Sequence, residues 1–410
     1  MDKQKEINPK LIGFIIKQER LKKNISASKL ALGIKKSRQY ISDIEKGMKS
    51  VSHATITEIF EFLNIKFEYQ ECTEAQDLFQ KFIDYYYLRD IPNAINRLAT
   101  IISNDVYKYS YDYPLIILCD FIFQELTHSN SNLSGDLFEF LNEIQCCIFL
   151  YFKGFSLLNK KQYEEALQSL RDAKKYEVHI PKFKGLIYYA EALGYDRLSD
   201  YLKSLEYNKK AKHEFLEYHN VERSLTSSLH IANIYSKIGR LQESIELYSD
   251  IYYEAKRFQI YRIIELIHYN LAIAFLYNQQ FQDAINEIHK LEYSRNMLAD
   301  YFFVLTWAYY ELGEYIESKK NLEKLIQCNT IELYYQHIIT LQSLRLQKDF
   351  NDGVYEQYLE NIVSYVLKNE LLPEQIFILK HTIEYFEQKK DYESAYKYSN
   401  KLNVLLNQRI

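Results

Sequence analysis

The chain has 410 residues, of which only 10 are glycine and 5 are proline. So few turn-forming residues argue against an all-β fold, and the length favours several domains or a repeat array over one core. The net charge of −4 is unevenly divided, because residues 1–66 carry +7 and the rest of the chain carries −11. This division predicts that a small basic head alone meets a polyanion, although chance fluctuation in a short segment is the alternative.

Membrane segments and catalytic motifs are missing from the sequence. No run of about 18 apolar residues occurs, and the charged N-terminus lacks the apolar segment of a signal peptide, so a cytoplasmic protein is expected. No phosphate-binding loop, dinucleotide fingerprint, zinc-protease motif or nucleophile elbow occurs, so we expect no enzyme, cofactor or metal. The five cysteines have no zinc-site spacing and are expected to be buried thiols: Cys72, Cys119, Cys146, Cys147 and Cys328.

The N-terminal segment has the periodicity of short amphipathic helices. In residues 11–24 the apolar positions fall near one helical face: Leu11, Ile12, Ile15, Ile16 and Leu21. Ser26 is placed to cap a second helix, and Ser37 to cap a third that Gly47 ends. A further amphipathic helix is predicted over residues 54–65. Four short helices in about 60 residues, with a tight connection between the second and third, indicate a helix-turn-helix unit.

Residues 8–66 resemble the phage-repressor-like, or XRE, family of helix-turn-helix domains. The matching positions are Ser26, Leu30, Ala31, Ser37, Ile41, Ile44, Glu45, Gly47, Leu63 and Ile65, and the most specific stretch is YISDIEKG at 40–47. The resemblance implies a structural salt bridge between Arg20 and Glu45. Lys35 replaces the family's glycine between the second and third helices, and Gly33 lies two residues earlier. This departure leaves open a re-spaced turn and a contact register moved by one residue.

The same resemblance implies a DNA-reading third helix. Its base-contacting positions map to Arg38, Gln39, Ser42 and Asp43. Arginine can bond guanine bidentately and glutamine can pair with adenine, whereas Asp43 can accept from cytosine or hold a nearby Arg or Lys. The phosphate-binding set would consist of lysines and helix-start serines, although for each lysine a solvated surface is the alternative: Ser26, Lys35, Lys36, Ser37, Lys46 and Lys49.

After a polar link at residues 68–74, one small-and-large spacing recurs in the body, residues 75–410. The small residue that opens each full copy steps by 34 to 40 residues, at Gly154, Ala192, Ala232, Ala272 and Thr306. This pattern resembles the tetratricopeptide repeat, whose unit is about 34 residues. We therefore expect an all-α chain with a right-handed α-solenoid of eight or nine helical pairs. These include a degenerate copy from about residue 75, with Ala94 and Leu98, and weak pairs at 110–145 and 331–368.

The first helix of each repeat should line a concave face that suits an extended peptide, because aromatic side chains can form apolar pockets and asparagine can pair with backbone amides. The residues expected there are Tyr189, Asp196, His230, Asn233, Ser236, Tyr269, Asn270, Phe303, Trp307, Tyr310 and Arg345. The alternative for Trp307 and the tyrosines is that they belong to the core or pack against another subunit.

A repressor-like head joined to a tetratricopeptide body resembles the Rgg/PlcR/NprR class of peptide-sensing transcription regulators. The resemblance implies a homodimer that binds a double-stranded DNA operator and a short signalling peptide in its repeat domain, as in quorum sensing. The alternative is a helical-repeat scaffold for a protein target, or a phage lysis–lysogeny regulator, with an autoregulatory DNA-binding head.

Overall fold

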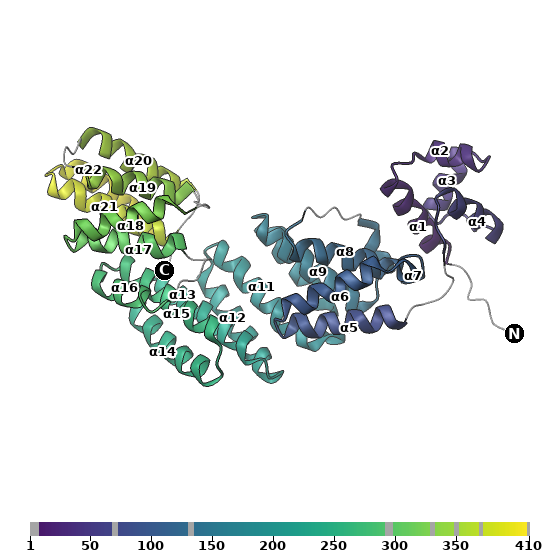
Figure 1. Cartoon of the computed structure of the whole chain (residues 1–410), viewed down its shortest axis with the longest axis horizontal. Coiled ribbons are helices and arrows are strands. Elements are labelled where there is room, and N and C mark those ends of the chain that lie inside the picture. Colours follow the sequence, from purple (N-terminus) through teal and green to yellow (C-terminus); the bar gives the residue numbers. More distant parts are fainter. Residues whose placement is uncertain are drawn as a thin grey trace. The chain divides into compact units, whose positions relative to one another are not determined.

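The computed structural model describes residues 8–67, 73–129, 135–291, 298–328, 333–347, 352–368 and 372–407. Within these ranges all regular secondary structure is helical, as the sequence predicts (Figure 1). The chain divides within helix α11, between Gly194 and Tyr195, into two compact units, residues 1–194 and 195–410. Most of the expected link at 68–74, together with Cys72, lies outside the described residues.

The head, at the start of the first unit, contains four helices. They are α1 (Pro9–Lys22), α2 (Ala27–Gly33), α3 (Arg38–Glu45) and α4 (His53–Phe62). The predicted starts of α2 and α3 are confirmed, because the hydroxyls of Ser26 and Ser37 accept hydrogen bonds from the backbone N–H of Lys29 and Tyr40, both at 3.1 Å. The head core comprises Ile12, Ile15, Ile16, Leu30, Ile41, Ile44, Ile56 and Ile59.

The position of Leu21 in the head differs from the sequence prediction, and the turn at Lys35 answers a question that the sequence left open. Leu21 was expected on the inner face of α1 but is exposed, because the inner stripe continues instead through the buried Glu19 and Arg20. Lys35 adopts the left-handed conformation, with φ of 54°, that glycine would supply. The backbone N–H of Lys36 reaches the carbonyl of Ala31 at 2.9 Å, which closes the end of α2 without displacing Ser37 from its capping position.

In the first unit, α1 also packs against the helices that follow the head. The buried Glu19 accepts a hydrogen bond of 2.7 Å from the hydroxyl of Tyr113, at the start of α8 (Tyr113–Leu126). The ring of Phe14 lies 6.1 Å from that of Tyr113 and 4.8 Å from that of Phe140, measured between centroids. These contacts join the head to the first helices of the body.

The rest of the first unit forms helical pairs with one irregular step. Its elements are α5 (Thr73–Tyr87), α6 (Ile91–Ser103), α7 (Asp105–Lys108), α8, the 3₁₀ helix η1 (Gly135–Phe140), α9 (Glu143–Asn159), α10 (Tyr163–Ala173), the 3₁₀ helices η2 (Lys174–His179) and η3 (Pro181–Phe183), and α11 (Lys184–Arg197). Ala94 and Leu98 are fully buried in α6, which fits the predicted degenerate repeat. The weak pair expected at 110–145 was wrong in part, because the six-residue 3₁₀ helix η1 follows α8 where a second α-helix was expected.

The second unit is a series of antiparallel helical pairs (Figure 1). After the end of α11 come α12 (Tyr201–Glu217), α13 (Val221–Lys237), α14 (Leu241–Arg257), α15 (Tyr261–Tyr277), α16 (Phe281–Ile288), α17 (Leu298–Glu311), α18 (Tyr315–Ile326), α19 (Leu333–Arg345), α20 (Asp352–Lys368), α21 (Leu372–Gln388) and α22 (Tyr392–Asn407). The predicted pair at 331–368 is therefore confirmed as α19 and α20.

The small residues of the repeat let paired helices approach closely. Ala232 and Ser244 are both fully buried, and the Ser244 hydroxyl donates to the Ala232 carbonyl at 2.8 Å, which joins α14 to α13. Thr306 and Ser318 repeat this arrangement between α17 and α18 at 2.7 Å. A larger side chain at either position would force the paired helices apart, so small residues recur at the same two positions in both repeats.

The cysteines fit the prediction of buried thiols only partly. Cys119, Cys146 and Cys147 are buried, and burial raises the pKa of the Cys146 thiol to about 11 and that of Cys147 to about 12. Cys328 is only half-buried, because it follows the end of α18 rather than lying inside a helical pair.

Candidate functional site

In the head, α3 presents a polar outer face. Ile41 and Ile44 are buried, whereas Arg38 and Gln39 are exposed at the start of the helix. The bidentate pair between Arg20 and Glu45 is present: Nε and Nη2 of Arg20 lie 2.7 and 3.0 Å from the two carboxylate oxygens. Arg20 also donates to the carbonyl of Ile25 at 2.8 Å. Glu45 therefore faces an internal cation and leaves the outer face of α3 free of its negative charge.

Asp43 has a partner on its own helix. The side-chain amide of Gln39 donates to the Asp43 carboxylate at 2.7 Å, one helical turn away. This hydrogen bond fixes which way the Gln39 amide is turned. The partner that the structure shows for Asp43 is thus Gln39, a predicted base-reading residue, and the cytosine contact expected for Asp43 stays a prediction.

The lysines expected to meet phosphate lie around this helix. Lys35, Lys36, Lys46 and Lys49 are all exposed. The ammonium groups of Lys36 and Lys49 lie 5.8 and 4.5 Å from the centroid of the Tyr40 ring, which keeps both close to α3. The hydroxyls of Ser26 and Ser37 are engaged in helix caps, so contacts to an anion there would come from the helix-start amides.

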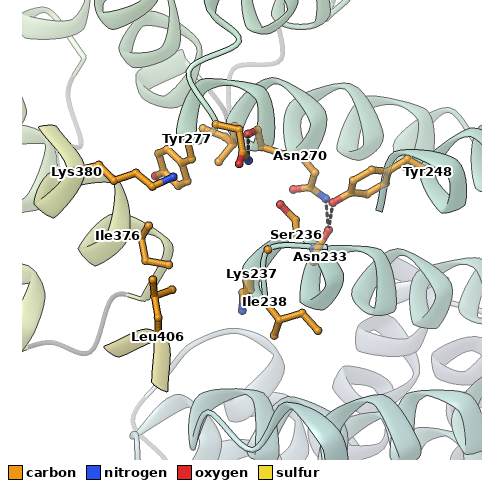
Figure 2. A pocket seen from close by; sticks show the side chains of 14 residues that line it. Asn233, Ser236, Lys237, Ile238, Tyr248, Asn270, Tyr277, Ile376, Lys380 and Leu406 are labelled. Atoms are coloured by element: carbon orange, nitrogen blue, oxygen red, sulfur yellow. Dashed lines mark hydrogen bonds between the residues drawn. The ribbon is translucent and has the colours of Figure 1, made fainter. Parts of the chain in front are cut away.

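In the second unit, a cavity of about 280 Å³ lies among α13, α15, α21 and α22 (Figure 2). Its lining includes three residues of the predicted peptide site, Asn233, Ser236 and Asn270. The other lining residues are Lys237, Ile238, Gly239, Tyr248, Ile273, Ala274, Tyr277, Asn278, Ile376, Lys380 and Leu406. The cavity thus combines aliphatic side chains with polar groups that include three asparagines and two lysines, and such a mixture can bind and orient a small ligand.

Asn233 and Asn270 form an oriented pair on one side of this cavity. The Asn233 side-chain oxygen accepts from the Tyr248 hydroxyl at 2.5 Å and from the Asn270 amide at 3.0 Å (Figure 2). Asn233 keeps its amide N–H groups as donors, and Asn270 keeps its side-chain oxygen as an acceptor. A peptide unit carries one acceptor and one donor, so this pair matches its hydrogen-bonding groups.

Asp196 and His230 form a buried network behind the cavity instead of lining it. Nζ of Lys237, which does line the cavity, lies 2.8 and 2.9 Å from the Asp196 carboxylate oxygens. His230 Nε2 lies 3.4 Å from the same carboxylate, and its Nδ1 contacts the amide of Asn208. Burial raises the pKa of Asp196, but the hydrogen bond from His230 and the charge of Lys237 outweigh it and hold that pKa well below its usual range.

The prediction that Phe303 and Trp307 contact a peptide is wrong for this structure. Each side chain is only 1% exposed. The Trp307 ring packs at 4.7 Å on Phe377 of α21, which covers the face of α17 that was expected to be open. The alternative that the sequence had left open, a place in the core, is the one observed.

The remaining predicted peptide contacts have other surroundings. The guanidinium group of Arg345 donates a hydrogen bond to Glu311 at 2.8 Å and lies 3.7 Å from the centroid of the Tyr310 ring. These contacts hold α19 against α17, and none of the three residues lines the cavity. Tyr269 is half-buried and its hydroxyl donates to Asp300 at 3.1 Å. Tyr189 is half-buried in the first unit.

Several lining residues were not found from the sequence. Lys237 directly follows the predicted residue Ser236 on α13. A prediction that allowed an error of one position in the helical register would have included Lys237 in the site. Lys380, Ile376 and Leu406 come from the last helical pair, more than a hundred residues beyond Asn270, and no local pattern connects them with α13 and α15.

Among the described residues, no group of three or more His, Cys, Asp or Glu side chains is arranged to hold a metal ion. None of the helices described combines the length and the apolar character that crossing a membrane requires.

Comparison with known proteins agrees with this two-part architecture. Residues 16–70 match the helix-turn-helix family model. The transcriptional activator NprA of Geobacillus stearothermophilus is 25% identical over 281 residues; the match covers 67% of this chain and 66%, just under two thirds, of that relative. The head is an XRE-type helix-turn-helix domain.

Several solved structures have a fold similar to that of this chain. A Rap protein complexed with competence and sporulation factor superposes with a TM-score of 0.65 at 15% identity, covering 82% of this chain and 99% of that one. NprR in complex with its cognate peptide NprX gives a TM-score of 0.55 at 15% identity, covering 82% and 98%. The likeness to these solved structures shows that this chain has the same kind of helical fold.

Proposed function

We propose that this chain is a transcription regulator that binds double-stranded operator DNA through α3, under the control of a short signalling peptide bound in the cavity of its repeat body. In this proposal the head spans residues 1–67, the link 68–74, and the peptide-binding and dimerising body 75–410. The protein works in the cytoplasm as a homodimer, and it acts by binding rather than by catalysis.

The oriented asparagine pair in the cavity is the observation that carries the proposal. Asn233 and Asn270 offer a donor and an acceptor to a peptide backbone, on a chain that also has a helix-turn-helix head. The named relatives support it: NprA is called a transcriptional activator, the NprR structure carries its cognate peptide NprX, and the Rap structure carries competence and sporulation factor. A peptide can change operator binding only by favouring one arrangement of the dimer over another. Because each head would read one half-site, the half-sites should lie one helical turn or more apart.

The test is to sequence the DNA bound by the protein in its own cells, grown with and without conditioned medium. We expect discrete operators whose occupancy changes with the dialysable, protease-sensitive fraction of the medium. Discrete operators with no response to that fraction would instead favour the scaffold or phage-regulator alternative. Recovery of no discrete DNA sites would contradict the DNA-binding role.

A further inference from the structure

Two lysine ammonium groups reach the cavity, and their electrostatic surroundings differ. Lys237 enters from α13 and is paired with Asp196 behind the lining, so its charge is compensated. Lys380 enters from α21 on the opposite side (Figure 2) and has no ion-pair partner among the described residues. The nearest acid along its helix, Glu384, is exposed and accepts a hydrogen bond from Gln279.

No other ionised group of the lining offsets the charge of Lys380. The lining contains no Asp or Glu. Its two tyrosines stay protonated, because burial raises the pKa of both Tyr248 and Tyr277 above the usual range. Glu374 of α21 lies behind the lining, where it is hydrogen-bonded to Tyr277 and interacts with the charge of Lys237, and burial raises the pKa of its carboxyl. Among the lining residues, Lys380 is the ammonium group without an acidic partner, and it lies beside the apolar side chains of Ile376 and Leu406.

A half-buried ammonium group of this kind favours an anionic partner. The lysine has lost part of its hydration, and the surrounding apolar groups screen it less than water does, so a charge-assisted hydrogen bond is stronger here than on an open surface. The volume of about 280 Å³ is at the lower end for ligand pockets, which suits an end or a short stretch of an extended peptide rather than a folded partner.

We propose that Lys380 binds a carboxylate of the signalling peptide while Asn233 and Asn270 hold a backbone amide next to it. The carboxylate is either the free C-terminus or an Asp or Glu side chain. This inference rests on the proposed peptide control. It adds that the cavity selects peptides by charge and that the last helical pair supplies the selecting residue.

The experiment presents the full-length protein with three equimolar pools of random synthetic heptapeptides. The first has free C-termini and no Asp or Glu, the second has amidated C-termini and one Asp or Glu, and the third has amidated C-termini and no acid. Peptides that remain with the protein after gel filtration are identified by mass spectrometry. The affinities of individual retained peptides are then measured from the fluorescence of Trp307, the single tryptophan, whose ring contacts Phe377 one turn before Lys380.

We expect retention from the first or the second pool but not from the third, and the pool that is retained identifies the source of the carboxylate. Lys380→Gln should weaken binding by about tenfold to a hundredfold, the usual range for losing a hydrogen bond between charged groups. Lys380→Glu should weaken it further and should retain peptides with an amidated C-terminus and a lysine. Lys368→Gln, which removes an exposed lysine on α20 away from the cavity, is the matched control and should bind as the unmodified protein does.

Equal retention from all three pools, or unchanged affinity in Lys380→Gln, would overturn charge selection while leaving peptide control intact. Retention from none of the pools would contradict peptide binding itself and the inference with it.

Discussion

Among single residues, Gln39 and Asp43 give α3 a specific reading geometry. Because Asp43 holds one amide hydrogen of Gln39, the pair presents a fixed donor and acceptor pattern rather than a freely rotating side chain. Both residues lie where the helix-turn-helix resemblance expects base contacts. Asp43 therefore limits what Gln39 can recognise.

We predict that Gln39→Ala or Arg38→Ala costs about 1–3 kcal/mol of binding free energy at the specific operator, because each removes a base-edge contact. Binding to unrelated DNA should change little. Titration of labelled operator and of scrambled DNA at one salt concentration measures both. A loss of equal size on the two DNAs would rule out base reading by these residues.

Substitutions on the two sides of the Asn233–Tyr248 hydrogen bond can distinguish a loss of peptide recognition from a loss of stability. Asn233→Ala should abolish the response of operator binding to peptide, but it also leaves the buried Tyr248 hydroxyl without its acceptor, which costs about 1–3 kcal/mol of stability. Tyr248→Phe removes the same hydrogen bond and keeps Asn233, so it is the control. Because Tyr248 itself lines the cavity and orients Asn233, we expect Tyr248→Phe to weaken the peptide response in a DNA-binding assay less than Asn233→Ala does. A normal response in Asn233→Ala would reject this site.

At the scale of helices and turns, the chain compensates for its few glycines by placing polar residues in left-handed turns. Gly239 and Gly313, with φ of 84° and 81°, follow α13 and α17. Lys161, with φ of 60°, occupies the matching place after α9, and other turns repeat this substitution. A side chain is strained in this conformation, so each such turn costs stability that glycine would not.

Lys161→Gly should therefore stabilise the first unit, because it relieves the strained backbone conformation. Glycine also makes the unfolded chain more flexible, which offsets part of this gain, so we expect a net stabilisation of about 0.5–1 kcal/mol. Lys160→Gly is the matched control, because Lys160 has an ordinary φ of −82° and glycine there should destabilise. Thermal unfolding of both variants gives the comparison. The same sign of change in both would show that turn conformation is not the cause.

The Asp196 network ties α11 to α13 and should make the second unit sensitive to acid. Because the folded pKa of Asp196 lies below its unfolded value of about 3.9, its contribution is complete above that pH and disappears as the pH falls through the lower, folded pKa. Asp196→Asn should cost about 2–3 kcal/mol at neutral pH, since Lys237 loses its partner. Urea unfolding followed by Trp307 fluorescence measures the free energy of unfolding of both proteins. The difference in this free energy between the unmodified protein and Asp196→Asn should become smaller below about pH 4. A difference that stays constant with pH would argue against the ion pair.

For the whole molecule, the separation of charge between head and body predicts how DNA binding responds to salt. Only the basic head should release counterions from DNA, because the body is acidic. Lys36→Gln should weaken binding to all sequences and reduce the slope of log affinity against log salt by about 1. Lys368→Gln on the body should leave the slope unchanged. Fluorescence anisotropy over a salt series measures both, and equal effects of the two changes would mean that the body also contacts DNA.

Local chemistry determined much of this protein, and it could therefore be found from the sequence. The serine caps of α2 and α3, the Arg20–Glu45 pair and the buried small residues of the repeats each depend on spacing within one helix or on a family pattern. Helical periodicity decides which side chains are buried within a pair, because it acts over a few residues. The helices and the class of fold follow from such short-range rules.

Only the tertiary structure decided which of the inward residues meet a ligand. Asn233 and Asn270 are 37 residues apart, and Lys380 lies a further 110 residues along the chain, yet all three line one cavity. The packing of α21 over α17 buries Trp307, whereas α13 and α15 keep their asparagines open to the cavity. Because the repeat steps vary from 34 to 40 residues and the last helical pair packs back over earlier helices, a position within the repeat does not fix where its side chain ends up.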